Sequence, residues 1–224
     1  MNNSTIPYWL TFAVLVAALY GGFKWYRVEQ SRAGVATSEI SLPPLQEFEL
    51  TTSSGEPFRS GEMKGKVWVA TFFFSTCPGS CARLNANIKH LSSMPETENV
   101  TWVSISVDPQ HDTLPVLREY ANRFNADPQR WLFCRHDEFD YIKRVADDVL
   151  RVGATYKGHA DHAVIVDKNG EIAGMFNATS TQESARGVET IKKLLAEPYA
   201  PGDQDAAEGA AAPGPDAVTS AEAA

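Results

Sequence analysis

Two of the three cysteines lie four residues apart, in the segment Cys77-Pro78-Gly79-Ser80-Cys81. The segment follows an apolar run over 67–74 that is typical of a buried strand, and the pattern predicts a helix after it. If both cysteines lie in the first turn of that helix, their side chains share one face. We expect Cys77 to be the N-cap and Pro78 the first helical residue, so that unpaired N–H groups lower the pKa of the Cys77 thiol. Such a thiolate attacks disulfides and binds soft metal ions.

The residues alone leave several uses of this pair open. A structural disulfide would close a loop of five residues and would stabilise the fold by only about 2 kcal/mol. The pair could also be two buried thiols that form no bond and have no chemical role. The same purely structural role, that of a core thiol, is predicted for Cys134 at the end of the run 131–134. Thiol–disulfide exchange in thioredoxins uses two intervening residues rather than three. Thioredoxins also have a cis-proline before the strand that corresponds to 163–167, and this chain has none there.

Metal binding is the remaining interpretation, because histidines occupy that place in Gly158-His159-Ala160-Asp161-His162. Two thiolates and one imidazole form a soft ligand set that favours copper, in particular Cu(I). Zinc requires a fourth ligand, for which His162 is the candidate. The distance in sequence between the cysteines and the histidines does not match a zinc finger.

Strands and helices alternate around these residues. A β-hairpin is predicted within 45–58, and further strands at 67–74, 101–107, 131–134, 163–167 and 172–176. Helices are predicted at 81–91, at 112–124 with Asp112 as the cap, at 137–150, and at 180–196 with a Ser180/Glu183 capping box. This order predicts a thioredoxin-like α/β domain, a central mixed sheet flanked by helices, with one additional helix-bearing insertion. Open α/β sheets place their chemistry at the carboxyl ends of the strands, where the cysteines lie.

Both ends of the chain are predicted to be appendages to a domain at 45–197. The eighteen residues 6–23 carry no charge and are flanked by aromatic residues, which predicts a transmembrane helix at 6–26 behind a short tail at 1–5. A cleaved signal peptide is the alternative, although no Lys or Arg precedes the run. A polar linker follows at 27–44. Residues 198–224 contain five carboxylates and no basic residue, and we expect them to be disordered.

Charge is distributed unevenly along the chain. The net charge is −8, and removing the five acids of the tail leaves −3 for the rest. No basic stripe is present, which argues against nucleic-acid binding. Lys24, Arg27 and Arg32 all follow the predicted transmembrane helix, and the positive-inside rule read literally would place the domain in the cytoplasm.

Three blocks of sequence together resemble the Sco/SenC family of membrane-anchored, thioredoxin-like copper proteins. The blocks are FFFSTCPGSC, SISVDPQHDTLPVLREYANRF and GHADHAVIVDKNGEIAGMFN, and the resemblance covers about Leu45 to Leu195. The family has a histidine eight residues before the Asp of a D-x-x-G turn, and counting back from Asp167 selects His159 rather than His162. The chain departs from the family pattern at Ala82, where proline is usual, and at Leu114, which separates Thr113 from Pro115.

This resemblance implies a copper-binding metallochaperone rather than an enzyme. Its task would be assembly of the CuA centre of cytochrome c oxidase, by copper delivery or by reduction of the cysteines of subunit II. It implies Cys77, Cys81 and His159 as ligands of Cu(I), Cu(II) or both. The expected partners are subunit II or a related oxidase, and other copper chaperones. The domain would lie on the periplasmic side of the membrane, opposite to the orientation that the positive-inside rule gives from the flanking charges.

The alternative function is a membrane-anchored thiol–disulfide oxidoreductase or redox sensor. It would use Cys77 and Cys81 without a metal, and His159 would then have no role in its activity.

Overall fold

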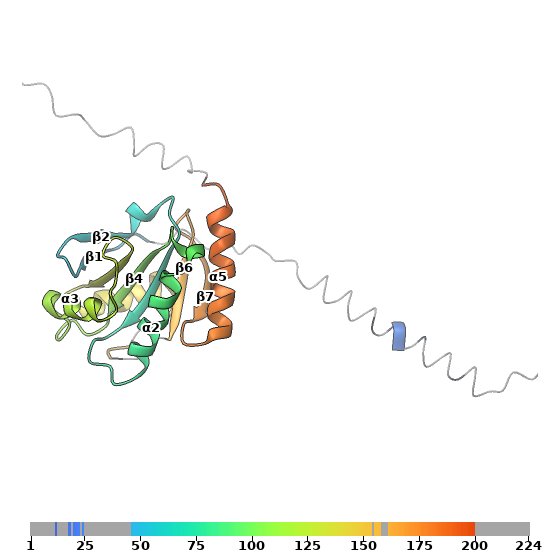
Figure 1. Cartoon of the computed structure of the whole chain (residues 1–224), viewed down its shortest axis with the longest axis horizontal. Coiled ribbons are helices and arrows are strands. Elements are labelled where there is room, and N and C mark those ends of the chain that lie inside the picture. The colour runs from blue at the N-terminus through green and yellow to red at the C-terminus, as the bar shows by residue number, and fades with distance from the viewer. Residues whose placement is uncertain are drawn as a thin grey trace, which may run out of the picture. The chain divides into compact units, whose positions relative to one another are not determined.

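The computed structural model describes residues 46–153, 155–157 and 161–199, together with residues 12, 18, 20–22 and 24. In this part of the chain, seven strands form one mixed sheet in the order β2-β1-β5-β4-β3-β6-β7 (Figure 1). The strands are β1 (Glu49–Thr52), β2 (Pro57–Arg59), β3 (Trp68–Phe73), β4 (Thr101–Ser106), β5 (Trp131–Arg135), β6 (His162–Val166) and β7 (Ile172–Asn177). β3, β4 and β5 run parallel, and the other neighbouring pairs are antiparallel.

Helices flank this sheet. They are η1 (Ser60–Met63), α2 (Ser80–Ser92), η2 (Pro95–Thr97), α3 (Leu114–Arg123), α4 (Phe139–Arg144), the π-helix η3 (Val145–Val149) and α5 (Thr181–Ala196). α2 joins β3 to β4 and α3 joins β4 to β5, so both helices connect neighbouring parallel strands. Right-handed crossovers in the same direction place these two helices on one face of the sheet. α5 lies along β7 in Figure 1.

The arrangement confirms the predicted thioredoxin-like fold and the hairpin before it. Every residue of β3 is buried, because the strand lies inside the sheet and is covered on both faces. Phe73 at its end stacks on Tyr120 of α3 with ring centroids 5.1 Å apart, and Phe133 of β5 meets the Phe73 ring edge-on. This aromatic packing fixes the strand end from which the cysteine loop departs.

Two helix boundaries and half of the predicted capping box differ from the prediction. Thr113, not Asp112, is the N-cap of α3, because the Asp112 carboxylate is engaged elsewhere, as described below. The helix predicted over 137–150 is regular only to Arg144 and then widens into η3. Ser180 does cap α5 by accepting a hydrogen bond from Glu183 N. The Glu183 carboxylate, however, accepts from Asn177 N at 2.8 Å, and thereby ties β7 to α5.

Most of the predicted appendages lie outside the described residues. This holds for the tail at 1–5, the linker at 27–44 and residues 200–224, and for all of the predicted transmembrane helix except residues 12, 18, 20–22 and 24, which are helical. None of the helices that the structure describes combines the length and the apolar run that a bilayer span requires.

Gly187 in α5 faces Phe176 of β7 at a distance that leaves no room for a side chain. A Cβ at position 187 would lie 2.6 Å from Cδ1 of the Phe176 ring. Overpacking of this kind costs about 1–3 kcal/mol, against which a helical Gly→Ala change regains about 1 kcal/mol. Because the approach is this close, we expect Gly187→Ala to lower the free energy of unfolding by about 1–2 kcal/mol in urea titrations.

Gly174 on β7 provides the matched control for this prediction. A Cβ there would meet its nearest atom, Thr190 Cγ2, only at 4.0 Å. We expect Gly174→Ala to change the free energy of unfolding by no more than about 0.5 kcal/mol. Equal effects of the two substitutions would contradict the proposed clash.

Candidate metal centre

The two cysteines lie together at the carboxyl end of the central strand. Cys77 belongs to the loop that follows β3, and Cys81 is the second residue of α2. The backbone N–H of Cys81 donates to Cys77 Sγ over 3.4 Å, and Ser80 Oγ lies 3.9 Å from the same sulfur. Cys77 is partly exposed, whereas Cys81 is only 3% exposed. The sequence therefore predicted correctly that this sheet edge brings the pair together.

The predicted position of Cys77 as the helix cap is wrong. The N-cap of α2 is Gly79, and the helix begins at Ser80 rather than at Pro78. The reason is a turn before the helix, in which Cys77 N donates to Phe74 O over 3.2 Å and keeps Cys77 outside the helix. The Cys77 sulfur still reaches the first N–H groups of α2 from this turn.

The two thiols differ in acidity. Burial raises the pKa of Cys77, but hydrogen bonds from the Cys81 thiol and from the backbone N–H groups of Gly79 and Cys81 outweigh it, so the pKa lies below the usual value. Burial and the hydrogen bond to Cys77 raise the pKa of Cys81 to about 12. Cys77 therefore carries the thiolate of the pair, and Cys81 remains a proton donor to it.

A buried carboxylate holds the loop before Cys77. Asp112 is fully buried, and its Oδ2 accepts hydrogen bonds from Ser75 N at 3.1 Å and from Ser106 Oγ at 2.5 Å. Ser75 Oγ also donates to Asp112 Oδ1. Asp112 therefore fixes the backbone at Ser75, two residues before Cys77. As the N-cap of α3 it would not contact this loop.

A second buried carboxylate, Asp108, contacts the segment that leads to His159. Its Oδ1 accepts a hydrogen bond from Tyr156 Oη at 3.1 Å, and Lys157 Nζ forms an ion pair with its Oδ2 at 3.2 Å. Neither Tyr156 nor Lys157 was predicted to belong to the site. No signal in the sequence marks them, because nearly fifty residues separate them from Asp108.

The predicted third ligand is not among the described residues, since 158–160 are outside them. After this gap, Asp161 O accepts a hydrogen bond from Ala178 N at 2.7 Å. His162 is the exposed first residue of β6 and pairs in register with Asn177. The described residues contain no group of three or more His, Cys, Asp and Glu side chains suited to a metal ion. The structure thus unites Cys77 and Cys81, and His159 stays a prediction.

A groove of about 270 Å³ opens beside the cysteine loop. Ser75 and Thr76 form its loop side, and His111, Val116, Glu119, Tyr120 and Arg123 form the rest. Burial, with smaller contributions from the neighbouring Cys81 and Cys77 thiols, raises the pKa of Tyr120 to about 12. The groove therefore lies at the edge of the domain from which the Cys77 loop departs.

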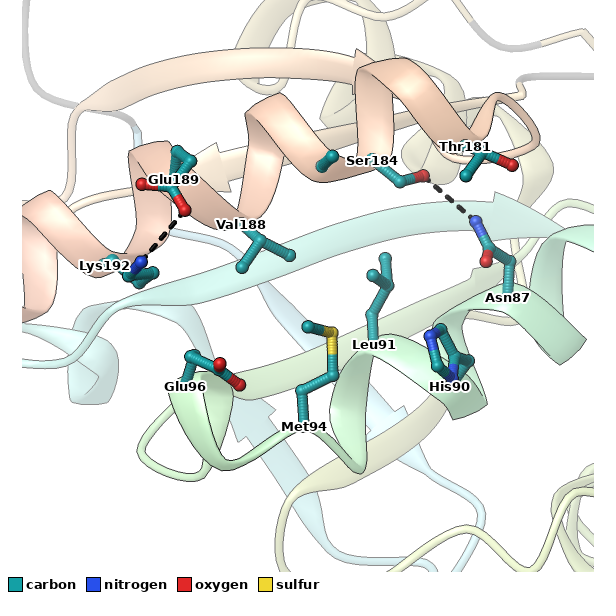
Figure 2. Close-up of a pocket in the computed structure, with 11 residues that line it drawn as sticks. Asn87, His90, Leu91, Met94, Glu96, Thr181, Ser184, Val188, Glu189 and Lys192 are labelled. Atoms are coloured by element: carbon teal, nitrogen blue, oxygen red, sulfur yellow. Dashed lines mark hydrogen bonds and ion pairs between the residues drawn. The ribbon is translucent and has the colours of Figure 1, made fainter.

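Another groove of about 250 Å³ lies between α2 and α5 (Figure 2). Leu91, Met94 and Val188 point into it, and a hydrogen bond of 3.0 Å from Asn87 to Ser184 closes one end. It lies along the second half of α2, whereas the cysteines lie at the beginning of that helix.

The third cysteine, Cys134, is buried in β5, as predicted, and burial raises the pKa of its thiol.

Comparison with known proteins identifies the class. The SCO1/SenC family model matches residues 41–196, and the chain belongs to this family. A SCO2-like protein of Rickettsia felis is 33% identical over 199 residues, which cover 81% of this chain and 94% of the relative. The family resemblance read from the three sequence blocks is thereby confirmed.

Solved structures of similar proteins share the fold. A SCO1/SenC family lipoprotein of Bacillus anthracis matches 68% of this chain and 95% of its own, with a TM-score of 0.63 and 27% identity. BsSco, a Sco family cytochrome c oxidase assembly protein with a disulfide switch, matches 67% and 94%, with a TM-score of 0.59 and 20% identity. Yeast Sco1 with copper bound matches 73% and 98%, with a TM-score of 0.56 and 24% identity.

Proposed function

We propose that this protein is a copper-binding assembly factor for the CuA centre of cytochrome c oxidase. In this proposal Cys77, Cys81 and His159 bind one copper ion, which is the cargo of the protein. The observation that carries the proposal is the thiol pair at the sheet edge, with Cys81 N 3.4 Å from Cys77 Sγ and one thiol acidified. Family membership supports it, as do the copper-bound structure of yeast Sco1 and the oxidase-assembly role stated for BsSco.

The chemistry of the donor set fits Cu(I). Thiolates and imidazole are soft ligands, and a set of three suits an ion of low coordination number. Cys77 is the more acidic thiol and ionises first, whereas Cys81, with its raised pKa, must lose its proton when the ion binds. Copper binding therefore releases a proton from Cys81, and the affinity falls as the pH is lowered.

Delivery of copper and reduction of the acceptor use the same thiols. A second candidate function is therefore a thiol–disulfide oxidoreductase or redox sensor without metal. The unequal acidity of Cys77 and Cys81 favours it, because an acidic, accessible thiol next to a buried one is the arrangement of dithiol exchange. The disulfide switch stated for BsSco is in keeping with it.

The same proposal gives the remaining parts of the chain their roles. Residues 6–26 anchor the protein in the membrane, 27–44 are the linker, and the domain at 45–197 faces the periplasm. Residues 198–224 form an acidic tail. The partners are subunit II of the oxidase or a related oxidase, and other copper chaperones. The uncharged run over 6–23 supports the anchor.

Anaerobic titration of the purified chain with Cu(I), in competition with a chromophoric chelator, tests the proposal. We expect one ion per chain, and loss of this binding in the double variant Cys77→Ser/Cys81→Ser. Cys134→Ser is the matched control and should bind like the parent, because Cys134 is fully buried in β5. Stoichiometric binding that survives the loss of both Cys77 and Cys81 would refute the proposal.

A further inference from the structure

The end of β4 and the loop that joins it to α3 contact two segments that precede proposed ligands in the sequence. On one side, Asp112 accepts hydrogen bonds from the backbone and side chain of Ser75, in the loop that carries Cys77. On the other side, Asp108 contacts Tyr156 and Lys157, in the segment that carries His159. In the sequence these two segments are about eighty residues apart.

The two carboxylates are themselves joined through Ser106. Its hydroxyl donates to Asp112 Oδ2 at 2.5 Å and accepts from Asp108 N at 3.1 Å. The backbone N–H of Asp112 also donates to Asp108 O at 2.9 Å. A continuous chain of polar contacts therefore runs from Ser75 to Lys157 across the end of the sheet.

Because Asp108 and Asp112 are buried, their contacts have a large effect on the free energy of the folded state. Asp108 and Asp112 are both 0% exposed, and a buried carboxylate is strongly unfavourable unless partners compensate its charge. For Asp108, the hydroxyl of Tyr156 and the ammonium group of Lys157 supply this compensation from outside the loop. Moving the segment at 156–157 away would leave the Asp108 charge buried without them, so the segment is held against the sheet edge.

We infer that Ser106, Asp108 and Asp112 form a polar bridge that positions the Cys77 loop and the segment at 156–157 relative to each other. The three are positioning residues, since the ligands proposed above are Cys77, Cys81 and His159. The inference rests on the proposed function only for its effect on copper binding. Its mechanical part, the coupling of two loops, holds for the metal-free protein as well.

Hydrogen exchange of the metal-free full chain, followed by mass spectrometry of peptides, tests the mechanical part. We expect Ser106→Ala to accelerate exchange both at 72–80 and at 152–161, by about tenfold, the factor that corresponds to one lost buried hydrogen bond. Asp108→Asn should accelerate exchange mainly at 152–161. Wild-type exchange at 152–161 in both variants would overturn the inference.

Ser104→Ala is the matched control. Ser104 is also a fully buried serine of β4, but its hydroxyl contacts Thr71 at 3.1 Å and accepts from Trp131 Nε1 at 3.0 Å, inside the core. We expect this variant to leave exchange at 72–80 and 152–161 within twofold of the parent. If Ser104→Ala accelerates both peptides as Ser106→Ala does, general destabilisation accounts for the effect and the bridge is refuted.

The affinity for Cu(I) provides a second measurement, because general destabilisation of the fold does not lower it in the pattern that the bridge predicts. We expect Asp108→Asn to weaken Cu(I) binding about tenfold, the lower end of the range for residues that orient metal ligands. Lys157→Met should have no further effect on affinity in the Asp108→Asn background, because the two side chains act through one contact. Additive losses of affinity in the double variant would contradict the single shared contact.

If the parent chain binds no Cu(I), the proposed function fails, while the hydrogen-exchange experiment still decides whether the bridge exists.

Discussion

At pH 8, Cys77 of the reduced, metal-free protein is expected to react with iodoacetamide at least about thirtyfold faster than Cys81. The pKa of Cys77 lies below 9.0, whereas that of Cys81 is about 12. At pH 8 the thiolate fractions therefore differ by at least about a thousandfold. The less acidic thiol is intrinsically the better nucleophile, which reduces the difference to about thirtyfold. Burial of Cys81 increases the difference again.

The pH dependence of the two reactions separates the thiols further. The rate at Cys77 should rise about tenfold per pH unit in the acidic range and should reach half of its maximum below pH 9, because the pKa of this thiol lies below 9.0. The rate at Cys81 should still be rising above pH 10. Mass spectrometry of peptides after timed quenching measures both rates, with the fully buried Cys134 as an unreactive internal control. Equal rates at Cys77 and Cys81 near neutral pH would contradict the assigned acidities.

His159→Ala is expected to lower the affinity for Cu(I) more than about 100-fold, because it removes a proposed ligand rather than a residue that orients one. Without the imidazole, the two sulfurs alone remain to hold the ion. The alternative function predicts a different result, in which this substitution leaves dithiol exchange unchanged. Chelator competition at a fixed pH measures the affinity, and the rate of iodoacetamide labelling at Cys77 reports whether the thiols are still intact.

His162→Ala is the control for this experiment. His162 is exposed at the start of β6 and pairs across the hairpin with Asn177. We expect its loss to change the affinity less than about threefold, which is the usual scale for an exposed surface substitution. An equal loss of affinity in both variants would make His162 a further ligand and would contradict the proposed set of Cys77, Cys81 and His159.

The sheet and the thiol pair were predictable because their signals are local. The apolar run over 67–74 predicts the buried strand that the structure places at Trp68–Phe73, and the chemistry of such folds lies at its carboxyl end. The Ser180 cap likewise follows from residues three positions apart. These features depend on neighbours in sequence, so one sequence contains enough information to find them.

Other features depend on contacts that no local pattern encodes. An aspartate just before a helix is a normal N-cap signal, and only the distant Ser75 draws the carboxylate of Asp112 away from that role. The contact between Asp108 and Lys157 is likewise invisible in sequence. The turn from Cys77 N to Phe74 O moved the start of α2 past Pro78. The role of His159 rests on the family pattern and stays a prediction.

The unequal burial of the two sulfurs makes Cys77 accessible from solvent and leaves Cys81 behind it in the core. With Cys81 only 3% exposed, an approaching protein meets Cys77 first. Exchange with a disulfide of a partner therefore starts at Cys77, whose thiolate forms a mixed disulfide and expels one thiolate of the partner. Cys81 then attacks Cys77, and the Cys77–Cys81 disulfide forms as the second thiolate of the partner leaves. The order in which the two sulfurs react is thus set by the turn that precedes α2.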